Sequence, residues 1–240
     1  MDLKIVDDLK VLFEKDSKVH AMWIAGSVAE GNNDELSDVD LWLDIDDNQD
    51  QQVLDKVEGF LATKGTIDVN FGEGLTPPFT HKVYHLAQMD PLHFIEINLH
   101  SHSHKFGLFD SLRKIKVLFD KDGSTDFESF DEANYSKMLN ERKQFLLEKI
   151  EFGELSVRKE IQRKHFLEAL HNYQFWLVEP IIEVIRIKHT PLKITYGLKH
   201  GSRDLPNEAV AAIESLYIIK SISDLNNKIG EVNELVKQYR

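Results

Sequence analysis

Hydrophobic and polar positions follow two different periods along the chain. Up to about residue 120, short apolar runs of strand length recur between polar turns, and a helical period occurs only near the start and after residue 48. The runs predict strands at 19–25, 39–45, 65–71, 82–86, 93–99 and 117–119, and helices at 2–16 and 49–63. The chain therefore opens as a mixed α+β region.

The pattern changes to long helical segments from residue 131 onward. Helices are expected over 132–152, 155–188, 206–217 and 222–238, with a kink at Pro180 inside the second. No repeat and no linker rich in Pro, Gly or Ser marks the border, which the change of composition places near residues 125–133. We therefore expect an α+β fold: a mixed sheet with helices on one face in residues 1–128, then an all-α helical bundle in residues 129–240.

Composition narrows the class of protein. The 240 residues are 42% hydrophobic and 29% charged, and no window approaches the ~18 to 20 apolar residues that a membrane span needs. The first residues are acidic and lack the apolar core of a secretory signal, so a cytoplasmic protein without a membrane partner is expected. The absence of cysteine excludes disulfides, thiolate zinc sites and cysteine nucleophiles.

The charge is negative and unevenly placed. The formal net charge is −12, which disfavours nucleic acid as a partner, because such affinity comes largely from Lys and Arg that neutralise phosphates. Residues 1–130 hold 25 Asp and Glu against 12 Lys and Arg, net −13, whereas residues 131–240 hold 16 against 17, net +1. The two regions therefore differ in electrostatics as well as in period.

A Gly-Ser corner after the first strand is suited to an anion. Gly26 and Ser27 follow a buried run that ends at Ala25, and a helix is expected directly after them. Glycine lets backbone N–H groups approach a ligand closely, and serine adds a hydroxyl donor. The corner therefore predicts a phosphate-binding turn.

Two carboxylates follow on the next strand. Asp38 and Asp40 are two residues apart, so both project from one face while Val39 and Leu41 project from the other. Two like charges side by side are unfavourable unless a cation lies near them. Mg²⁺ takes carboxylate and phosphate oxygens as ligands, so the pair predicts a metal held beside a triphosphate, with Mn²⁺ as an alternative ion.

A third carboxylate is expected on a later strand. The alternation in residues 93–99 places Glu96 opposite the apolar face, which makes it the preferred candidate for completing a two-metal cluster. Asp68 also sits on an expected strand between apolar residues, and it remains the alternative.

At these residues the sequence resembles the nucleotidyltransferase superfamily that includes DNA polymerase β and the antibiotic nucleotidyltransferases of bacteria. Its signature is a Gly-Ser turn, a short helix, Asp-x-Asp on the next strand and a later carboxylate; Gly26, Ser27, Asp38 and Asp40 match it, and Glu96 fits the last position. The helical tail is more loosely similar to that of aminoglycoside- and lincosamide-type enzymes. The resemblance covers roughly residues 19–100 and implies a polymerase β-like catalytic domain followed by a substrate-binding helical domain.

The residues and the resemblance together predict an enzyme. We expect a metal-dependent transfer of a nucleoside monophosphate from an NTP, with ATP as the first candidate, to a hydroxyl of a small molecule, with release of pyrophosphate. The acceptor is expected to be aminoglycoside- or lincosamide-like. Two alternatives stay open: a nucleotide-binding regulatory or antitoxin-like protein of the same fold, and an enzyme that nucleotidylates proteins. The oligomeric state, a homodimer included, also stays open.

Further candidates lie outside this signature. Lys193, Lys199 and Arg203 are expected to supply cations to the β- and γ-phosphates. His100, His102 and His104 continue the alternation of Glu96, which fits either a second metal site or an exposed strand end, and the lack of a spacing typical of zinc favours the exposed end. Asp44, Asp46 and Asp47 are expected to form a solvated strand end without a chemical role.

Overall fold

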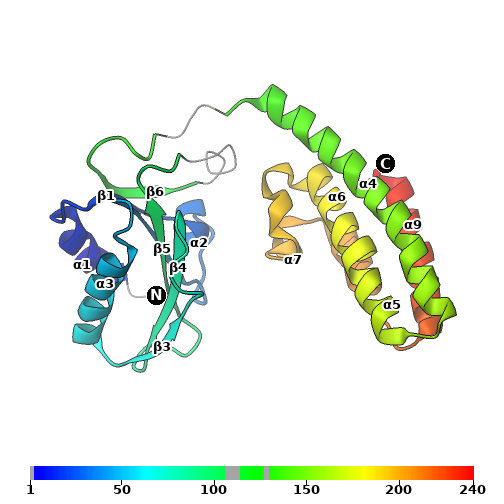
Figure 1. Ribbon diagram of the computed structural model, residues 1–240, viewed down its shortest axis with the longest axis horizontal. Helices are drawn as coiled ribbons and strands as arrows, with labels where there is room; N and C mark the ends of the chain where they lie inside the picture. The colour runs from blue at the N-terminus through cyan, green and yellow to red at the C-terminus, as the bar shows by residue number, and fades with distance from the viewer. Residues whose placement is uncertain (1–2, 106–113, 127–129) are drawn as a thin grey trace. The chain divides into compact units, whose positions relative to one another are not determined.

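The computed structural model describes residues 3–105, 114–126 and 130–240. The chain divides into two compact units, Met1–Phe130 and Asp131–Arg240, each with its own hydrophobic core. The boundary expected from the sequence, between residues 128 and 129, lies outside the described residues. Figure 1 shows the strands in the first unit and the long helices in the second.

The first unit alternates strands with a few helices. In chain order its elements are α1 (Leu3–Glu14), β1 (Val19–Ile24), α2 (Gly26–Glu30), β2 (Val39–Ile45), α3 (Asp50–Lys64), β3 (Ile67–Phe71), β4 (Phe79–Leu86), β5 (Ile95–Ser101) and β6 (Lys116–Asp120). Each expected strand is present, although β4 starts three residues earlier than its apolar run.

The six strands form one mixed sheet in the order β3-β4-β5-β2-β1-β6. β2 and β5 pair in parallel at the centre, with Asp40 opposite Glu96, and the other neighbours are antiparallel. The central register places residues that are 56 positions apart in the chain side by side.

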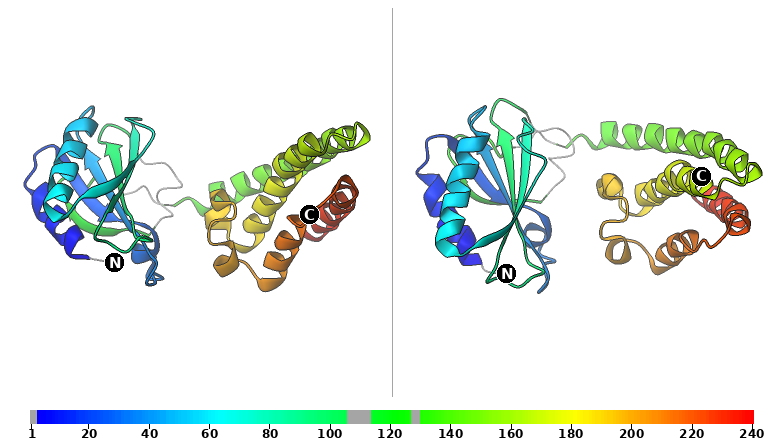
Figure 2. Two further views of the ribbon diagram at one scale, coloured as in Figure 1. Left: turned by 90° about the horizontal axis from the view of Figure 1, so that it is seen from below. Right: turned by 60° about the horizontal axis from the view of Figure 1, so that its bottom comes forward.

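Helices α1 and α3 cover one face of this sheet, and both views of Figure 2 show them on the same side of the strands. The alternation of β2 explains the arrangement, because Val39, Leu41, Leu43 and Ile45 are buried in the core on that side. Asp38 and Asp40 therefore project from the opposite face. On that opposite face Trp23 and Trp42 stack with their ring centroids 6.0 Å apart.

The second unit is helical. It contains α4 (Glu132–Gln162), α5 (Phe166–Tyr173), a π-helical segment (Gln174–Val178), α6 (Glu179–His189), a 3₁₀ segment (Pro191–Tyr196), α7 (Gly201–Asp204), α8 (Asn207–Leu216) and α9 (Ile222–Tyr239). Its core is built from α4, α5, α6, α8 and α9. The predicted α+β fold, a mixed sheet followed by helices, is thus confirmed.

Two helix boundaries differ from the prediction. α4 runs without interruption through residues 153–155, where a break was expected, and ends at Gln162 before Lys164, which has a left-handed φ of 61°. Gly153 lies inside the helix, where its lack of a side chain lets Trp176 pack closely against the backbone. A Cβ at Gly153 would lie 2.2 Å from the Cβ of Trp176. The irregularity expected at Pro180 is the π-helical segment that ends two residues before it.

The helices of the described ranges include none that is long and apolar enough to cross a bilayer.

Candidate active site

The Gly26–Ser27 corner is positioned by the end of β1. Gly26 has a φ of +63°, a conformation that favours glycine, and opens the five-residue helix α2. The amide of Ala25 donates to the carbonyl of Asp40 at 2.9 Å, which fastens the corner to β2. The turn and the first carboxylates are therefore neighbours in the fold.

Asp38 and Asp40 lie at the start of β2, half-buried on the face away from α1 and α3. The amide of Phe94 donates to Asp38 Oδ1 at 2.7 Å, so this carboxylate also ties β2 to the entry of β5. Its hydrogen bond fixes the side chain at the strand end where the Gly-Ser corner lies.

The two oxygens of Asp40 have different neighbours. Oδ1 accepts hydrogen bonds from Trp42 Nε1 at 3.1 Å and from Asn98 Nδ2 at 2.9 Å. Oδ2 faces the turn, since a Cβ added to Gly26 would lie 3.1 Å from it. The carboxylate is held in one orientation, and a side chain larger than glycine at position 26 would crowd it.

Glu96 lies directly across from Asp40 in the parallel β2–β5 ladder. Neighbouring strands are roughly 4.8 Å apart, so the register brings the two carboxylates to the same place on one face. His81 of β4 approaches from the other side, with Nε2 at 3.4 Å from Glu96 Oε2. Glu96 and His81 side chains are 36% and 49% exposed, which leaves them accessible to a ligand.

Asp68, the alternative third carboxylate, is placed elsewhere. It lies on β3, and β4 and β5 separate that strand from β2. Its Oδ1 is 2.6 Å from Nδ1 of the buried His85. The structure thus brings Glu96, and not Asp68, beside Asp38 and Asp40.

The three cations predicted to bind phosphate all belong to one segment of the helical unit. Lys193 Nζ and Arg203 Nε both contact Asp204, at 3.2 and 3.0 Å, whereas the Lys199 side chain is exposed. The carbonyl of Lys199 accepts from Nη2 of Arg186 at 2.7 Å. Arg186 is fully buried, so it holds this segment in place through hydrogen bonds and does not face solvent.

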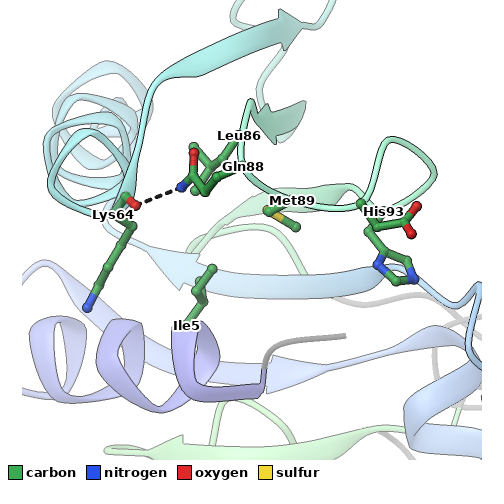
Figure 3. Close-up of a pocket in the computed structure, with 7 residues that line it drawn as sticks. Ile5, Lys64, Leu86, Gln88, Met89 and His93 are labelled. Carbon is green, nitrogen blue, oxygen red and sulfur yellow. Dashed lines mark hydrogen bonds between the residues drawn. The ribbon is translucent and has the colours of Figure 1, made fainter.

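Each unit has a pocket among its described residues. In the first unit, a pocket of about 610 Å³ is bordered by Ile5, Lys64, Gln88 and His93 among others (Figure 3), and none of Asp38, Asp40 or Glu96 lines it. In the helical unit, a pocket of about 350 Å³ lies beside α7 and α8.

The sequence prediction missed two partners of the carboxylates and misread one acid and one histidine. Asn98 and His81 contact Asp40 and Glu96, and the alternation of β5 gave a signal only for Asn98. His100, expected at an exposed strand end, is only 1% exposed, and so is Asp44, expected at a solvated strand end. Asp44 accepts hydrogen bonds from His100 Nδ1 and His102 Nδ1, which come from β5 and the residue after it.

The comparisons with known proteins concern the fold. No protein-family model matches the chain, and no curated protein matches its sequence. An aminoglycoside 6-adenyltransferase from Bacillus subtilis is 13% identical with a TM-score of 0.41, over 99% of this chain and 86% of that one. A nucleotidyltransferase-like protein from Exiguobacterium sibiricum is 10% identical with a TM-score of 0.43, over 98% and 74%.

A third structure is a spectinomycin adenyltransferase from Enterococcus faecialis, crystallised with ATP and spectinomycin. It is 12% identical with a TM-score of 0.40, over 98% of both chains. By their names, two of the three are adenyltransferases and one is a nucleotidyltransferase-like protein.

Proposed function

We propose that the chain is a nucleotidyltransferase that moves a nucleoside monophosphate from an NTP, ATP first, to a hydroxyl of a small-molecule acceptor. One observation carries this proposal: Asp38, Asp40 and Glu96 share one end of the central parallel strands, with Asp40 Oδ2 facing the Gly26–Ser27 turn. Anion-binding and cation-binding groups therefore adjoin, as an NTP–metal complex requires.

The residues fit a hard divalent cation. The three side chains offer carboxylate oxygens, the ligands that Mg²⁺ and Mn²⁺ take together with phosphate oxygens. When bound, the metal would neutralise charge on the triphosphate and lower the pKa of an acceptor hydroxyl. Asp38 and Asp40 would hold it against the triphosphate, and Glu96 would bind a second ion or take the acceptor's proton.

The reaction needs one bond formed and one broken. The acceptor oxygen bonds to the α-phosphorus, the bond from that phosphorus to the α,β-bridging oxygen breaks, and pyrophosphate leaves with the electron pair. Where Glu96 acts as the base and does not bind the second ion, it receives the hydroxyl proton. The Gly26 and Ser27 amides and the Ser27 hydroxyl hold the departing phosphates, so catalysis comes from alignment and charge neutralisation.

Lys193, Lys199 and Arg203 are proposed as cations for the β- and γ-phosphates, and the helical unit is proposed to bind the acceptor. The acidic first unit suits a cationic acceptor, because long-range attraction raises its local concentration. Aminoglycosides, lincosamides and spectinomycin are therefore the first acceptors to screen.

The test is calorimetric titration of ATP, GTP, CTP and UTP, each with Mg²⁺, into the wild-type protein and three variants. Asp40→Asn and Glu96→Gln should weaken Mg²⁺-dependent binding of the preferred nucleotide by about tenfold or more. Asp40→Asn keeps an oxygen that can accept from Trp42 and Asn98, so its fold should hold.

Asp68→Asn is the matched control, because it neutralises a strand carboxylate outside the site. It should bind nucleotide as the wild type does. If no nucleotide binds, or if Asp68→Asn rather than Glu96→Gln weakens binding, the proposed site is wrong. Nucleotide that binds without any pyrophosphate release would favour a regulatory protein, and labelled nucleotide that transfers onto protein would favour a protein-modifying enzyme.

A further inference from the structure

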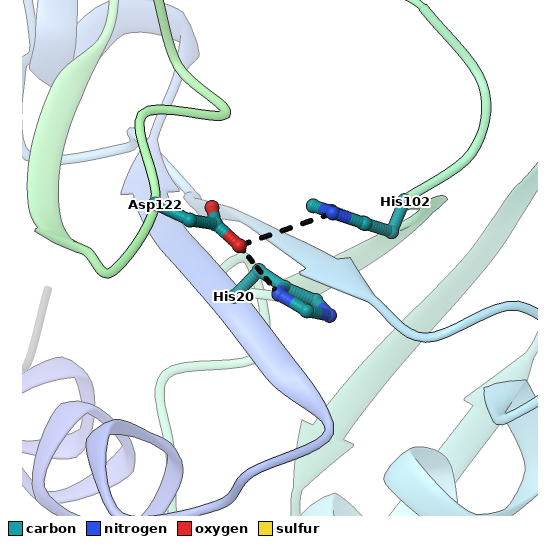
Figure 4. Close-up of side chains that lie close together, drawn as sticks. All are labelled: His20, His102 and Asp122. Atoms are coloured by element: carbon teal, nitrogen blue, oxygen red, sulfur yellow. Dashed lines mark hydrogen bonds and ion pairs between the residues drawn. The ribbon is translucent and has the colours of Figure 1, made fainter.

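A cluster of histidines and carboxylates lies at the far end of the same central strands. His20 comes from β1, His102 is the residue after β5, and Asp122 lies in the loop after β6 (Figure 4). Asp44 lies near the end of β2, and Asp46 directly follows that strand. Asp44 is four residues beyond Asp40, so the cluster begins about 13 Å from the proposed nucleotide site. It is therefore a separate feature of the first unit.

Three side chains converge there. One donor atom from each of His20, His102 and Asp122 lies within 4.8 Å of the others. Asp122 Oδ2 is 2.7 Å from His20 Nδ1 and 3.8 Å from His102 Nε2. The two rings stack with centroids 3.7 Å apart and an interplanar angle of 15°, so they must tilt toward Asp122 for both nitrogens to reach one ion. Ligand atoms on a tetrahedral zinc ion, with bonds of 2.0 to 2.1 Å, are about 3.3 Å apart. The two observed separations lie on either side of that value.

The other ring nitrogen of each imidazole lies within hydrogen-bond distance of a second carboxylate. His20 Nε2 is 2.8 Å from Asp46 Oδ1, and His102 Nδ1 is 2.8 Å from Asp44 Oδ2. Carboxylates in this position fix the ring orientation and the tautomer of metal-binding histidines. The buried Asp44 is itself held by His100 Nδ1 at 3.2 Å.

The surroundings favour a cation and leave access for it. His102 and Asp122 side chains are each 39% exposed, and His20 is 20% exposed. The adjacent Lys121 directs its ammonium group to the carbonyls of Asp16 and Val19, at 2.6 and 2.5 Å, and not to the cluster. The negative charge of the carboxylates is thus not taken up by this lysine.

From this geometry we propose that His20, His102 and Asp122 form a binding site for a divalent transition metal of the Zn²⁺ type, with Asp44 and Asp46 orienting the two histidines. Two imidazoles and one carboxylate suit Zn²⁺ and Co²⁺ better than Mg²⁺, which prefers oxygen ligands. Three protein ligands leave one coordination position for water or for an exogenous ligand. The site goes beyond the proposed nucleotidyl transfer and would operate whether or not that proposal holds.

The test is direct metal binding to the full chain without nucleotide. Titration with Co²⁺ should give the visible absorption of a four-coordinate ion at one equivalent per chain, and Zn²⁺ should displace it. His102→Asn and Asp122→Asn should weaken Zn²⁺ binding at least tenfold, and Asp44→Asn by 10- to 100-fold through the loss of its support for His102.

Two control variants separate this site from others. His104→Asn removes a histidine of the same segment that is outside the cluster, and Asp40→Asn alters the proposed nucleotide site; both should bind Zn²⁺ as the wild type does. Broadening of the His20 and His102 ring signals by Co²⁺ in the wild-type protein gives a readout that needs no variant. Absence of one-to-one binding, or equal affinity in His102→Asn, would show that the cluster is only an ion-paired network.

Discussion

Acidic residues of the same type serve different purposes here because their immediate neighbours differ. Asp40 accepts from Trp42 and Asn98 and faces a glycine turn, whereas Asp44, four residues on, is buried among histidines. Asp68 is joined to a single histidine on the neighbouring strand. The alternation of polar and apolar positions predicted the face of Asp40, but it could not identify partners that lie 56 or 58 residues away.

The Asp68–His85 pair makes a pH-dependent contribution to stability. The hydrogen bond to Asp68 raises the pKa of His85 above 6.5, and this outweighs the opposing effect of burial. Folding therefore favours the protonated ring. The stabilisation is complete below about pH 6.5 and is lost as the pH rises through the raised pKa.

NMR titration of the His85 ring should show this shift in the wild type, and Asp68→Asn should move the pKa back down. Glu73→Gln, which changes an exposed acid in the same unit, should leave the titration of His85 unchanged. A His85 pKa that is the same in Asp68→Asn would contradict the assignment of Asp68 as the cause.

At the scale of elements, periodicity located the strands well and the helix ends less well. Strand faces follow from a period of two, and β2 shows it directly, with Val39, Leu41 and Leu43 buried. Glycine within a helix is ambiguous from sequence alone, since it can end the helix or admit a neighbouring side chain. In α4 the deciding partner is Trp176, which another helical segment supplies.

Two glycine-to-alanine changes in the helical unit should have opposite effects. Gly153→Ala would put its Cβ 2.2 Å from that of Trp176, and such overpacking costs about 1–3 kcal/mol of unfolding free energy. Gly230→Ala, on the exposed side of α9 with no atom within 4 Å of the added Cβ, should stabilise by about 0.5–1 kcal/mol.

Urea unfolding of both variants beside the wild type measures the difference. If Gly153→Ala is as stable as Gly230→Ala, then Gly153 does not serve the packing of Trp176.

The whole molecule has two cores that share no residue. The larger core cluster of the first unit lies between the sheet and the helices α1 and α3, and that of the second unit lies among its helices. The change of period near residue 131 indicated this division in the sequence. The period could not indicate whether any side chain of the second unit takes part in nucleotide binding, because no spacing rule links residues in separate cores.

Separate cores predict that the helical unit folds alone. Residues 131–240, expressed by themselves, should retain a helical circular dichroism spectrum and unfold cooperatively, because their buried residues contact one another. The full chain is the reference. A non-cooperative melt of the isolated unit would show that it depends on the first unit for its stability.

The parallel pairing of β2 with β5 also limits how this chain can change. The proposed nucleotide carboxylates and the histidine–carboxylate cluster occupy the two ends of the same strands and the same face. Because side chains alternate with a period of two, deleting one residue between Asp40 and Asp44 would turn one group toward the hydrophobic core while the other stayed in place. The spacing of the two groups along β2 can therefore change only by an even number of residues if both are to stay on the same face of the sheet.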